Sequence, residues 1–259
     1  MGNIFVELQQ LTMQQTVTKI EESRKNLNAI VSYFKSRSDY LELVTIFAKQ
    51  VRNLEVSTLL NADSFMCQDI ISTDLPLELQ HDSLGFCRGA SVIFDGRYVY
   101  PVKDVRGDVM GFCGYDKFSE TKYLDSKNHG YVAKTYSLWG MEMLPNYYRS
   151  NEPVFFIEGI VCALYLRQCG LQALAYLGSS PSHYVMEIMR RFGMRAVVIT
   201  DSDDAGTVCR RRINRCLPQI RVVQSTVAKD IDDSREIAPD FTEELSKMSN
   251  PFYRSHLFN

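Results

Sequence analysis

Apolar residues recur at helical spacing along the first third of the chain. Neither glycine nor proline interrupts this pattern between Asn3 and Leu75. Such a pattern predicts helices from residue 1 to about residue 82. The stretch carries 7 Lys and Arg residues against 11 Asp and Glu residues. This acidic balance favours a helical platform or a partner-docking bundle over an arm that binds nucleic acid.

The pattern changes between residues 86 and 150, where glycines cluster and short β-prone runs replace the helical spacing. Three such runs predict strands at residues 91–94, 98–102 and 109–112. Asp95-Gly96 and Arg106-Gly107-Asp108 lie between these runs and are typical of hairpin turns. We therefore expect a small mixed α/β subdomain with an antiparallel sheet.

From Pro153 onward, short apolar runs alternate with helical segments. The runs predict strands at residues 154–157, 173–177, 196–200 and 220–223. The segments between them predict helices at residues 161–169, 181–192 and 205–217, with Pro181 at the first helical position of the second. Asp240 and Glu243 have the spacing of a capping box for a last helix. Repeated strand–helix units predict a parallel sheet with helices on both faces, and the three patterns predict domains at 1–85, 86–150 and 151–259.

Acidic residues follow the strands of this predicted parallel sheet. Glu158 follows the first strand, Asp201 and Asp203 follow the third, and Asp230 and Asp232 come after the fourth. Ligands bind outside the carboxyl ends of parallel strands, so these side chains would meet if the first and third strands were neighbours. That condition favours the strand order 2-1-3-4. Because carboxylates so close repel one another, a hard cation such as Mg²⁺ would stabilise them, and the arrangement predicts a metal-dependent site for phosphoryl or nucleotidyl transfer.

The overall composition excludes some classes of protein. The 259 residues are 45% apolar and 23% charged, with a net charge of −2, so any contact with nucleic acid must come from local patches. No run approaches the roughly 20 apolar residues that a membrane span needs, and the first residues lack the basic lead of a signal peptide. Seven cysteines without a Cys-x-x-Cys pair indicate a reducing cytoplasm.

Four motifs of the last hundred residues stand in the order typical of a TOPRIM domain, the catalytic module of primases and of several topoisomerases and nucleases. They are Phe156-Ile157-Glu158-Gly159, Ala175-Tyr176-Leu177-Gly178-Ser179-Ser180, Asp201-Ser202-Asp203-Asp204-Ala205-Gly206 and Lys229-Asp230-Ile231-Asp232-Asp233. Two upstream stretches, at residues 94–112 and 121–141, resemble the opening and the basic motifs of the DnaG-type primase core of bacteria and phages. The resemblance covers roughly residues 90–235. Topoisomerases and recombination TOPRIM proteins do not carry the upstream block.

The resemblance implies a DNA primase-like nucleotidyltransferase that synthesises short RNA primers from NTPs on single-stranded DNA. It implies Glu158, Asp201 and Asp203 as catalytic residues, with Glu158 as a general base being an alternative to a metal ligand. It also implies Mg²⁺ or Mn²⁺, held by Glu158, Asp201, Asp203, Asp230 and Asp232. Implied contacts to nucleotide or DNA are Lys122 and Lys134 and, after them, Arg97 and Arg106. Implied partners are a replicative helicase or a zinc-binding protein, in the cytoplasm of a bacterium or of a phage-infected host.

The chain departs from the family pattern in three ways. Cys162 stands where the family commonly has an Asp, four residues after Glu158, and Cys113-Gly114-Tyr115 replaces Gly-Gly-Arg. We also expect no zinc-binding module before the core and no helicase after it. Two alternatives therefore stay open: a TOPRIM nuclease that uses water as nucleophile, and a non-catalytic TOPRIM adaptor of a replication complex.

Two further features have more than one interpretation. Ser179 and Ser180 follow Gly178 at a helix start, where they fit phosphate binding through backbone N–H groups or a plain N-cap. The arginines at 210, 211, 212 and 215 would form a basic helix face that either follows a phosphate backbone or is simply solvated.

Overall fold

We analysed a computed structural model of the chain, which describes residues 21–50, 54–126, 138–224, 240–248, 250, 253, 255 and 257–258. The chain divides into two compact units. The first comprises Met1–Val44, Ala62–Pro101 and Asp108–Ala133, and the second comprises Thr45–Asn61, Val102–Gly107 and Lys134–Asn259. Among the described residues, no helix has the length and apolar character needed to cross a bilayer.

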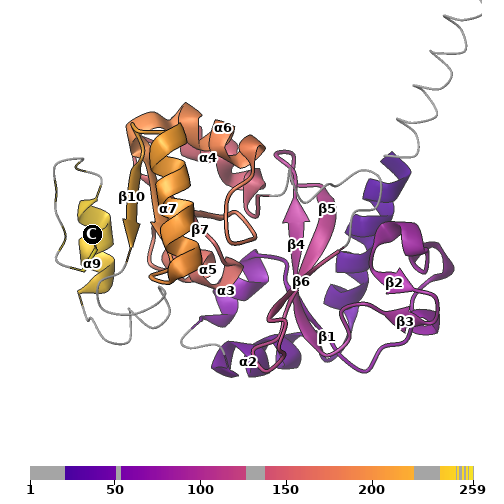
Figure 1. The fold of residues 1–259 in the computed structure, drawn as a ribbon. Coiled ribbons are helices and arrows are strands. Elements are labelled where there is room, and N and C mark those ends of the chain that lie inside the picture. Colours follow the sequence, from indigo (N-terminus) through magenta and orange to yellow (C-terminus); the bar gives the residue numbers. More distant parts are fainter. Residues whose placement is uncertain are drawn as a thin grey trace, which may run out of the picture. The chain divides into compact units, whose positions relative to one another are not determined.

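The first unit is built on a four-stranded sheet whose strands lie in the order β1-β4-β5-β6 (Figure 1). These strands are β1 (Phe65–Cys67), β4 (Arg97–Lys103), β5 (Val109–Tyr115) and β6 (Tyr123–Asp125). The pairs β1–β4 and β5–β6 are antiparallel, as is the small ladder of β2 (Cys87–Arg88) with β3 (Ser91–Val92). The antiparallel sheet predicted between residues 86 and 150 is therefore confirmed.

Aromatic side chains fill the core of this unit. The Phe34 and Phe65 rings stack at 4.3 Å between centroids, and the Phe86 and Phe112 rings meet edge to face at 5.1 Å. Phe34 belongs to a helix over residues 21–36 whose apolar face also buries Leu27, Ile30 and Val31 in the same cluster. The spacing of these four residues is that of one helix face. This part of the N-terminal region thus shares one core with the sheet.

The predicted helical run from residue 1 to residue 82 is confirmed only in part. The described part contains the helix over 21–36, α2 (Tyr40–Gln50) and α3 (Val56–Asn61). It then forms strand β1 and three short 3₁₀ turns, at Ser72–Asp74, Leu77–Leu79 and Asp82–Leu84. The prediction of helix for residues 65–82 was wrong, because pairing of β1 with β4 outweighs local helical spacing. The domain boundaries at residues 85 and 150 stay predictions.

Both predicted turns of the antiparallel region form, with glycine in the left-handed conformation. At the first, Arg97 N donates to Phe94 O (2.9 Å) and Gly96 has φ +74°. It is not a hairpin, because β3 and β4 belong to different sheets. At the second, Gly107 N donates to Asp104 O (3.0 Å) between β4 and β5, which are neighbours in one sheet.

The second unit is built on a parallel sheet with the strand order β10-β9-β7-β8. The strands are β7 (Val154–Ile157), β8 (Gln172–Ala175), β9 (Ala196–Thr200) and β10 (Arg221–Gln224). Every residue of β7 and β9 is buried, as expected for central strands covered on both sides. In chain order this is 2-1-3-4, so the predicted strand order is confirmed.

Helices connect these strands and cover the sheet (Figure 1). They are α5 (Ile160–Gln168), which contacts β7 and β8, α6 (His183–Phe192), which contacts β9, and α7 (Asp204–Cys216), which contacts β9 and β10. Crossovers between parallel strands are right-handed. The chain moves from β7 to β8 in one direction across the sheet and from β8 to β9 and β10 in the opposite direction. The first crossover therefore places α5 on one face of the sheet, and the next two place α6 and α7 on the other face. The predicted parallel sheet with helices on both faces is confirmed.

The starts of two helices differ from the expected ones. Ser182 is the N-cap of α6, and its side chain accepts a hydrogen bond from Val185 N (3.2 Å), so Pro181 lies before the helix rather than at its first position. The last helix, α9 (Phe241–Lys247), begins after Asp240 without a side-chain cap bond. The helix is confirmed there, and its capping box is not.

Trp139 extends the sheet at its β8 edge. Its backbone N and O pair with Ala175 at 2.8 and 3.2 Å, and its buried ring lies 4.3 Å below the guanidinium of Arg167. A Cβ on Gly140 would lie 2.0 Å from Arg167 Nη2. The Trp139-Gly140 pair therefore packs α5 against the segment that leads to α4 (Leu144–Arg149).

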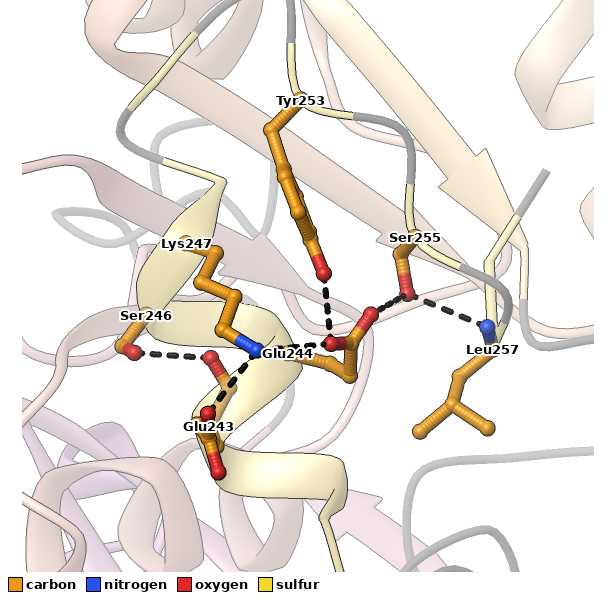
Figure 2. A network of polar contacts seen from close by, with 7 residues as sticks. All are labelled: Glu243, Glu244, Ser246, Lys247, Tyr253, Ser255 and Leu257. Carbon is orange, nitrogen blue, oxygen red and sulfur yellow. Dashed lines mark hydrogen bonds and ion pairs between the residues drawn. The ribbon is translucent and has the colours of Figure 1, made fainter.

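The C-terminal segment is held to α9 by the carboxylate of Glu244 (Figure 2). This side chain is 2% exposed and accepts hydrogen bonds from Tyr253 Oη (2.5 Å), Ser255 Oγ (2.6 Å) and Lys247 Nζ (3.2 Å). The hydrogen bonds from Ser255 and Tyr253, followed by Lys247, lower the pKa of Glu244 to about 2. Glu244 is thus a structural carboxylate whose charge the surrounding donors stabilise.

Candidate active site

The strand ends of the parallel sheet bring two of the predicted acidic residues to one edge. Glu158 follows β7 directly, and Asp201 follows β9. The two strands pair in parallel with Phe156 opposite Val198. Since neighbouring parallel strands end at the same edge of a sheet, Glu158 and Asp201 leave it side by side.

A buried tyrosine lies within the electrostatic reach of both carboxylates. Tyr176, just after β8, is 4% exposed. Burial is the main cause that raises the pKa of its phenol, and Cys209, Glu158 and Asp201 all add to the effect. Burial also raises the pKa of the Cys209 thiol on α7, and Glu158 adds to that effect. Both negative charges therefore act on the same small region at the carboxyl edge of the sheet.

The backbone at this edge adopts an unusual conformation. Leu177 has φ +52°, a value that only a few per cent of non-glycine residues adopt. Its N–H donates to Glu158 O (3.1 Å), and Tyr176 N donates to Ile157 O (2.8 Å). These bonds fix the chain after β8 against the chain after β7. Backbone strain of this kind is often found at functional sites.

Asp203 has a role in the fold that the sequence pattern did not predict. It is the N-cap of α7, and its Oδ1 accepts a hydrogen bond from Gly206 N (2.9 Å). Gly206 lies directly against the preceding loop, since a Cβ there would be 1.9 Å from Asp201 O. The spacing from Asp201 to Gly206 thus builds a tight turn from strand β9 into α7.

Gln224 holds the backbone of Asp201 from the neighbouring strand. Its Nε2 donates to Asp201 O (2.7 Å), and its Oε1 accepts from Arg210 Nη1 on α7 (3.1 Å). Gln224 is 8% exposed at the end of β10. The loop that carries Asp201 is therefore held by β10 and α7 together.

The donor set at this edge fits a hard divalent cation in its chemistry. Glu158 and Asp201 offer carboxylate oxygens, and Thr200 Oγ1 is buried beside Asp201 without a hydrogen-bond partner in the described part of the chain. Oxygen ligands of this kind are those that Mg²⁺ takes. Within the described residues, however, no three His, Cys, Asp or Glu side chains form a group that could hold a metal ion. Asp230 and Asp232 lie outside the described residues, and the ligand roles of all five residues stay predictions.

The predicted basic contacts fall at three places. Lys122 is exposed at the end of the β5–β6 loop, and Arg106 is exposed in the β4–β5 turn. The Arg97 guanidinium donates to Thr121 O (2.9 Å) and Ser119 Oγ (3.1 Å), so it braces the β5–β6 loop. Lys134 lies outside the described residues. The nucleotide or DNA contacts proposed for these four residues stay predictions.

Some of the serines and arginines that have two interpretations make hydrogen bonds within the fold. Ser180 Oγ accepts a hydrogen bond from Arg212 Nη1 (2.7 Å), which ties the loop after β8 to α7. Neither Ser179 nor Ser180 is the cap of α6, which is Ser182. Arg211 and Arg215 are exposed on α7.

Sequence patterns did not single out three residues that shape this site. Tyr176 and Gly206 stood inside recognised motifs, but their roles depend on contacts with other strands and loops. Gln224 belongs to no recognised motif, and a glutamine at the end of a strand is not a distinctive sequence signal. Its part in the site is visible only because β10 lies beside β9.

Comparison with known proteins agrees with this architecture. No family model matches the chain. The DNA primase of Borreliella burgdorferi is 25% identical over 241 residues, which cover 87% of this chain and 44% of that protein. A DnaG primase catalytic domain solved bound to ssDNA superposes with a TM-score of 0.76 at 16% identity, over 91% of this chain and 80% of that one. The zinc-binding and RNA polymerase domains of the Aquifex aeolicus primase give a TM-score of 0.73 at 20% identity, over 90% of this chain and 61% of that one.

The chain has the fold of a DnaG-type primase catalytic core. The predicted resemblance and the predicted fold class are thereby confirmed. The chain spans between 24% and 44% of the length of three DNA primases that it matches. In a core of this type, the edge that carries Glu158 and Asp201 is the carboxyl edge of the TOPRIM sheet.

Proposed function

We propose that this chain is the catalytic core of a primase, which synthesises short RNA primers from NTPs on single-stranded DNA. The observation that carries the proposal is the meeting of Glu158 and Asp201 at adjacent parallel strand ends within a DnaG-type fold. Relatives named DNA primase and a related domain solved with ssDNA support the reaction and the template.

The residues of the proposed site would bind the metal ion, position its ligands or contact phosphates. Glu158 and Asp201 would hold Mg²⁺ or Mn²⁺, with Asp203, Asp230 and Asp232 as further candidate ligands. Such an ion, when bound, supplies positive charge at the attacking and leaving oxygens of an in-line displacement. Gln224 and Gly206 keep the Asp201 loop against α7, and the buried Tyr176 lies just after β8, near both carboxylates. Lys122, Lys134, Arg97 and Arg106 are the proposed contacts to phosphates of nucleotide or template.

A priming assay tests the proposal directly. The purified chain is incubated with labelled NTPs and single-stranded DNA, with Mg²⁺, with Mn²⁺ and with a chelator. We expect short RNA products that require the divalent ion and a template. A parallel reaction without NTPs follows the length of the DNA, because cleavage there would identify a TOPRIM nuclease instead.

A non-catalytic adaptor of a replication complex is the second candidate. Two observations favour it: Cys162 stands on the first turn of α5 where an Asp was expected, and the described residues lack a three-member metal group. Template-dependent products in the assay above would exclude it. Binding of single-stranded DNA without synthesis under any divalent ion would establish it.

The proposed partners are a replicative helicase or a zinc-binding protein. A zinc-binding domain accompanies the polymerase domain in the Aquifex aeolicus primase, which supports the second. We propose the cytoplasm of a bacterium or a phage-infected host as the setting. The cysteines support it, because all seven lie in the described part of the chain and none forms a disulfide, and reduced thiols suit a reducing compartment.

A further inference from the structure

The loop that joins β5 to β6, residues 116–122, is held in one conformation by its own backbone. Asp116 N donates to Lys122 O (2.9 Å), which closes the loop at its base. Phe118 N donates to Asp116 Oδ1 (2.9 Å), which fixes the first turn of the loop. At the base, the rings of Tyr115 and Tyr123 lie 5.0 Å apart across the two strands.

Arg97 braces this loop from the neighbouring strand β4. Its guanidinium donates to Thr121 O (2.9 Å), Lys122 O (3.4 Å) and Ser119 Oγ (3.1 Å). Gly114 makes this reach possible, since a Cβ there would lie 3.1 Å from Arg97 Cδ and 2.6 Å from Phe94 Cδ1. The loop is therefore supported from its base and from its side.

Phe118 stands at the tip of this braced loop and is 85% exposed. Single exposed apolar side chains are common on protein surfaces, so exposure by itself indicates no function. The surroundings of Phe118 are more informative. Lys117 and Lys122 are exposed on either side of it in the sequence, and Glu120 is the one exposed acidic residue of the loop. Asp116 is engaged with the backbone of Phe118.

We propose that Phe118 stacks on a base of single-stranded nucleic acid, with Lys117 and Lys122 beside its phosphates. Sites that bind single strands combine aromatic stacking surfaces with cations along the backbone. A braced loop loses little conformational freedom when it binds, because it is already ordered. A docking site for an apolar protein surface fits less well, since polar and charged residues surround one isolated ring. The inference rests on the proposed function in taking the template strand as the ligand.

Fluorescence anisotropy with a labelled oligothymidylate, without NTPs or divalent ions, tests this inference. We expect Phe118→Ala and Phe118→Leu to weaken binding roughly tenfold, within the range for loss of one stacked base. Phe118→Trp should bind as the wild type does. Leu77→Ala is the matched control, because Leu77 is also exposed in the first unit (80%), and its affinity should not change.

A strand with abasic residues separates stacking from phosphate contact. On that strand, the wild type and Phe118→Ala should bind equally. The slope of log affinity against log salt should fall by about 0.7 in Lys122→Ala and in Lys117→Ala, and stay unchanged in Phe118→Ala. Wild-type affinity of Phe118→Leu for oligothymidylate would overturn stacking in favour of a general apolar contact.

The priming assay keeps this inference distinct from the proposed function. If the wild type binds the strand and primes while Phe118→Ala keeps full affinity, the inference fails and the function stands. If Phe118→Ala weakens binding but the wild type makes no primer, the inference stands and the proposed catalysis fails. A wild-type chain that neither binds the strand nor primes would overturn both.

Discussion

Glu244 and the pair Glu158 and Asp201 are carboxylates of the same unit, but their surroundings differ. Glu244 is buried among three donors, and these donors lower its pKa to about 2 (Figure 2). Glu158 and Asp201 lie half-buried at a sheet edge. Burial raises the pKa of the neighbouring Tyr176, and the two negative charges add to that effect.

This difference separates Glu244, a structural carboxylate, from the two carboxylates proposed to be catalytic. A carboxylate that accepts several hydrogen bonds contributes to stability, and its removal leaves buried donors unpaired. Two carboxylates that lie close together repel instead. Glu158 and Asp201 leave adjacent parallel strands at the same edge of the sheet, where a divalent cation would offset such repulsion. Variants of Glu158 or Asp201 should therefore lower activity, whereas variants of Glu244 should lower stability.

The largest expected effect is on primer synthesis in Glu158→Ala and Asp201→Ala. Removing either carboxylate should lower the rate at least about 100-fold, because a bound metal ion supplies several kcal/mol of transition-state stabilisation. The thermal midpoint should stay the same or rise, because one of two repelling charges is lost. Parallel priming and thermal unfolding assays check both results. Full activity of either variant would remove that residue from the catalytic site.

Gly206→Ala should damage both activity and stability. The added Cβ would meet Asp201 O at 1.9 Å, so α7 and the Asp201 loop must move apart. Forcing a methyl group into a packed site costs about 1–3 kcal/mol, and priming should fall with the displaced carboxylate. Ala205→Ser, at an exposed neighbour in the same turn, is the control. Wild-type activity of Gly206→Ala would show that the position of the Asp201 loop does not matter.

Glu244→Gln should show the opposite pattern from Glu158→Ala. Its free energy of unfolding should fall by about 2 kcal/mol, the scale of hydrogen bonds to a charged group. The rate of priming per folded molecule should not change. Chemical denaturation at neutral pH measures the first quantity, and an assay at equal folded concentration measures the second. A loss of activity at unchanged stability would reverse the assignment of the two sites.

The pH dependence of stability should distinguish Glu244 from its Gln variant. Because the folded-state pKa of Glu244 is lowered to about 2 from 4.5, its contribution is fully present above pH 4.5. That contribution is lost as the pH falls from 4.5 towards 2. The difference in unfolding free energy between wild type and Glu244→Gln should therefore shrink across this window. A difference that stays constant down to pH 3 would contradict the assignment.

The smallest expected effect is that of Gln224→Leu. This variant loses the hydrogen bond to Asp201 O. Because leucine has nearly the same side-chain volume as glutamine, the Asp201 loop loosens without a cavity being formed. We expect a few-fold higher Mg²⁺ concentration at half-maximal priming, with a smaller change at saturating Mg²⁺. Gln219→Leu, at an exposed position, is the control. An unchanged Mg²⁺ requirement would make Gln224 a purely structural residue.

The parallel sheet was predictable because its central strands are buried on both sides. Such strands appear in the sequence as short unbroken apolar runs, and both β7 and β9 were predicted with their observed limits. The strand order followed from requiring Glu158 and Asp201 to meet. β1 was missed, because three residues carry too little periodicity and its pairing with β4 decides its conformation.

The sequence by itself determined the fold class, the order of the parallel strands and the placement of Glu158 and Asp201 at strand ends. These features depend on local hydrophobic patterns and on the rules of parallel sheets. Only the tertiary structure decided that Asp203 caps α7, that Gln224 holds Asp201 and that Glu244 binds the C-terminal segment. It also decided that Phe118 stands on a loop braced by Arg97. The reason is physical: each of these roles requires donors and acceptors from different segments, which only folding brings together, so a local sequence pattern cannot predict them.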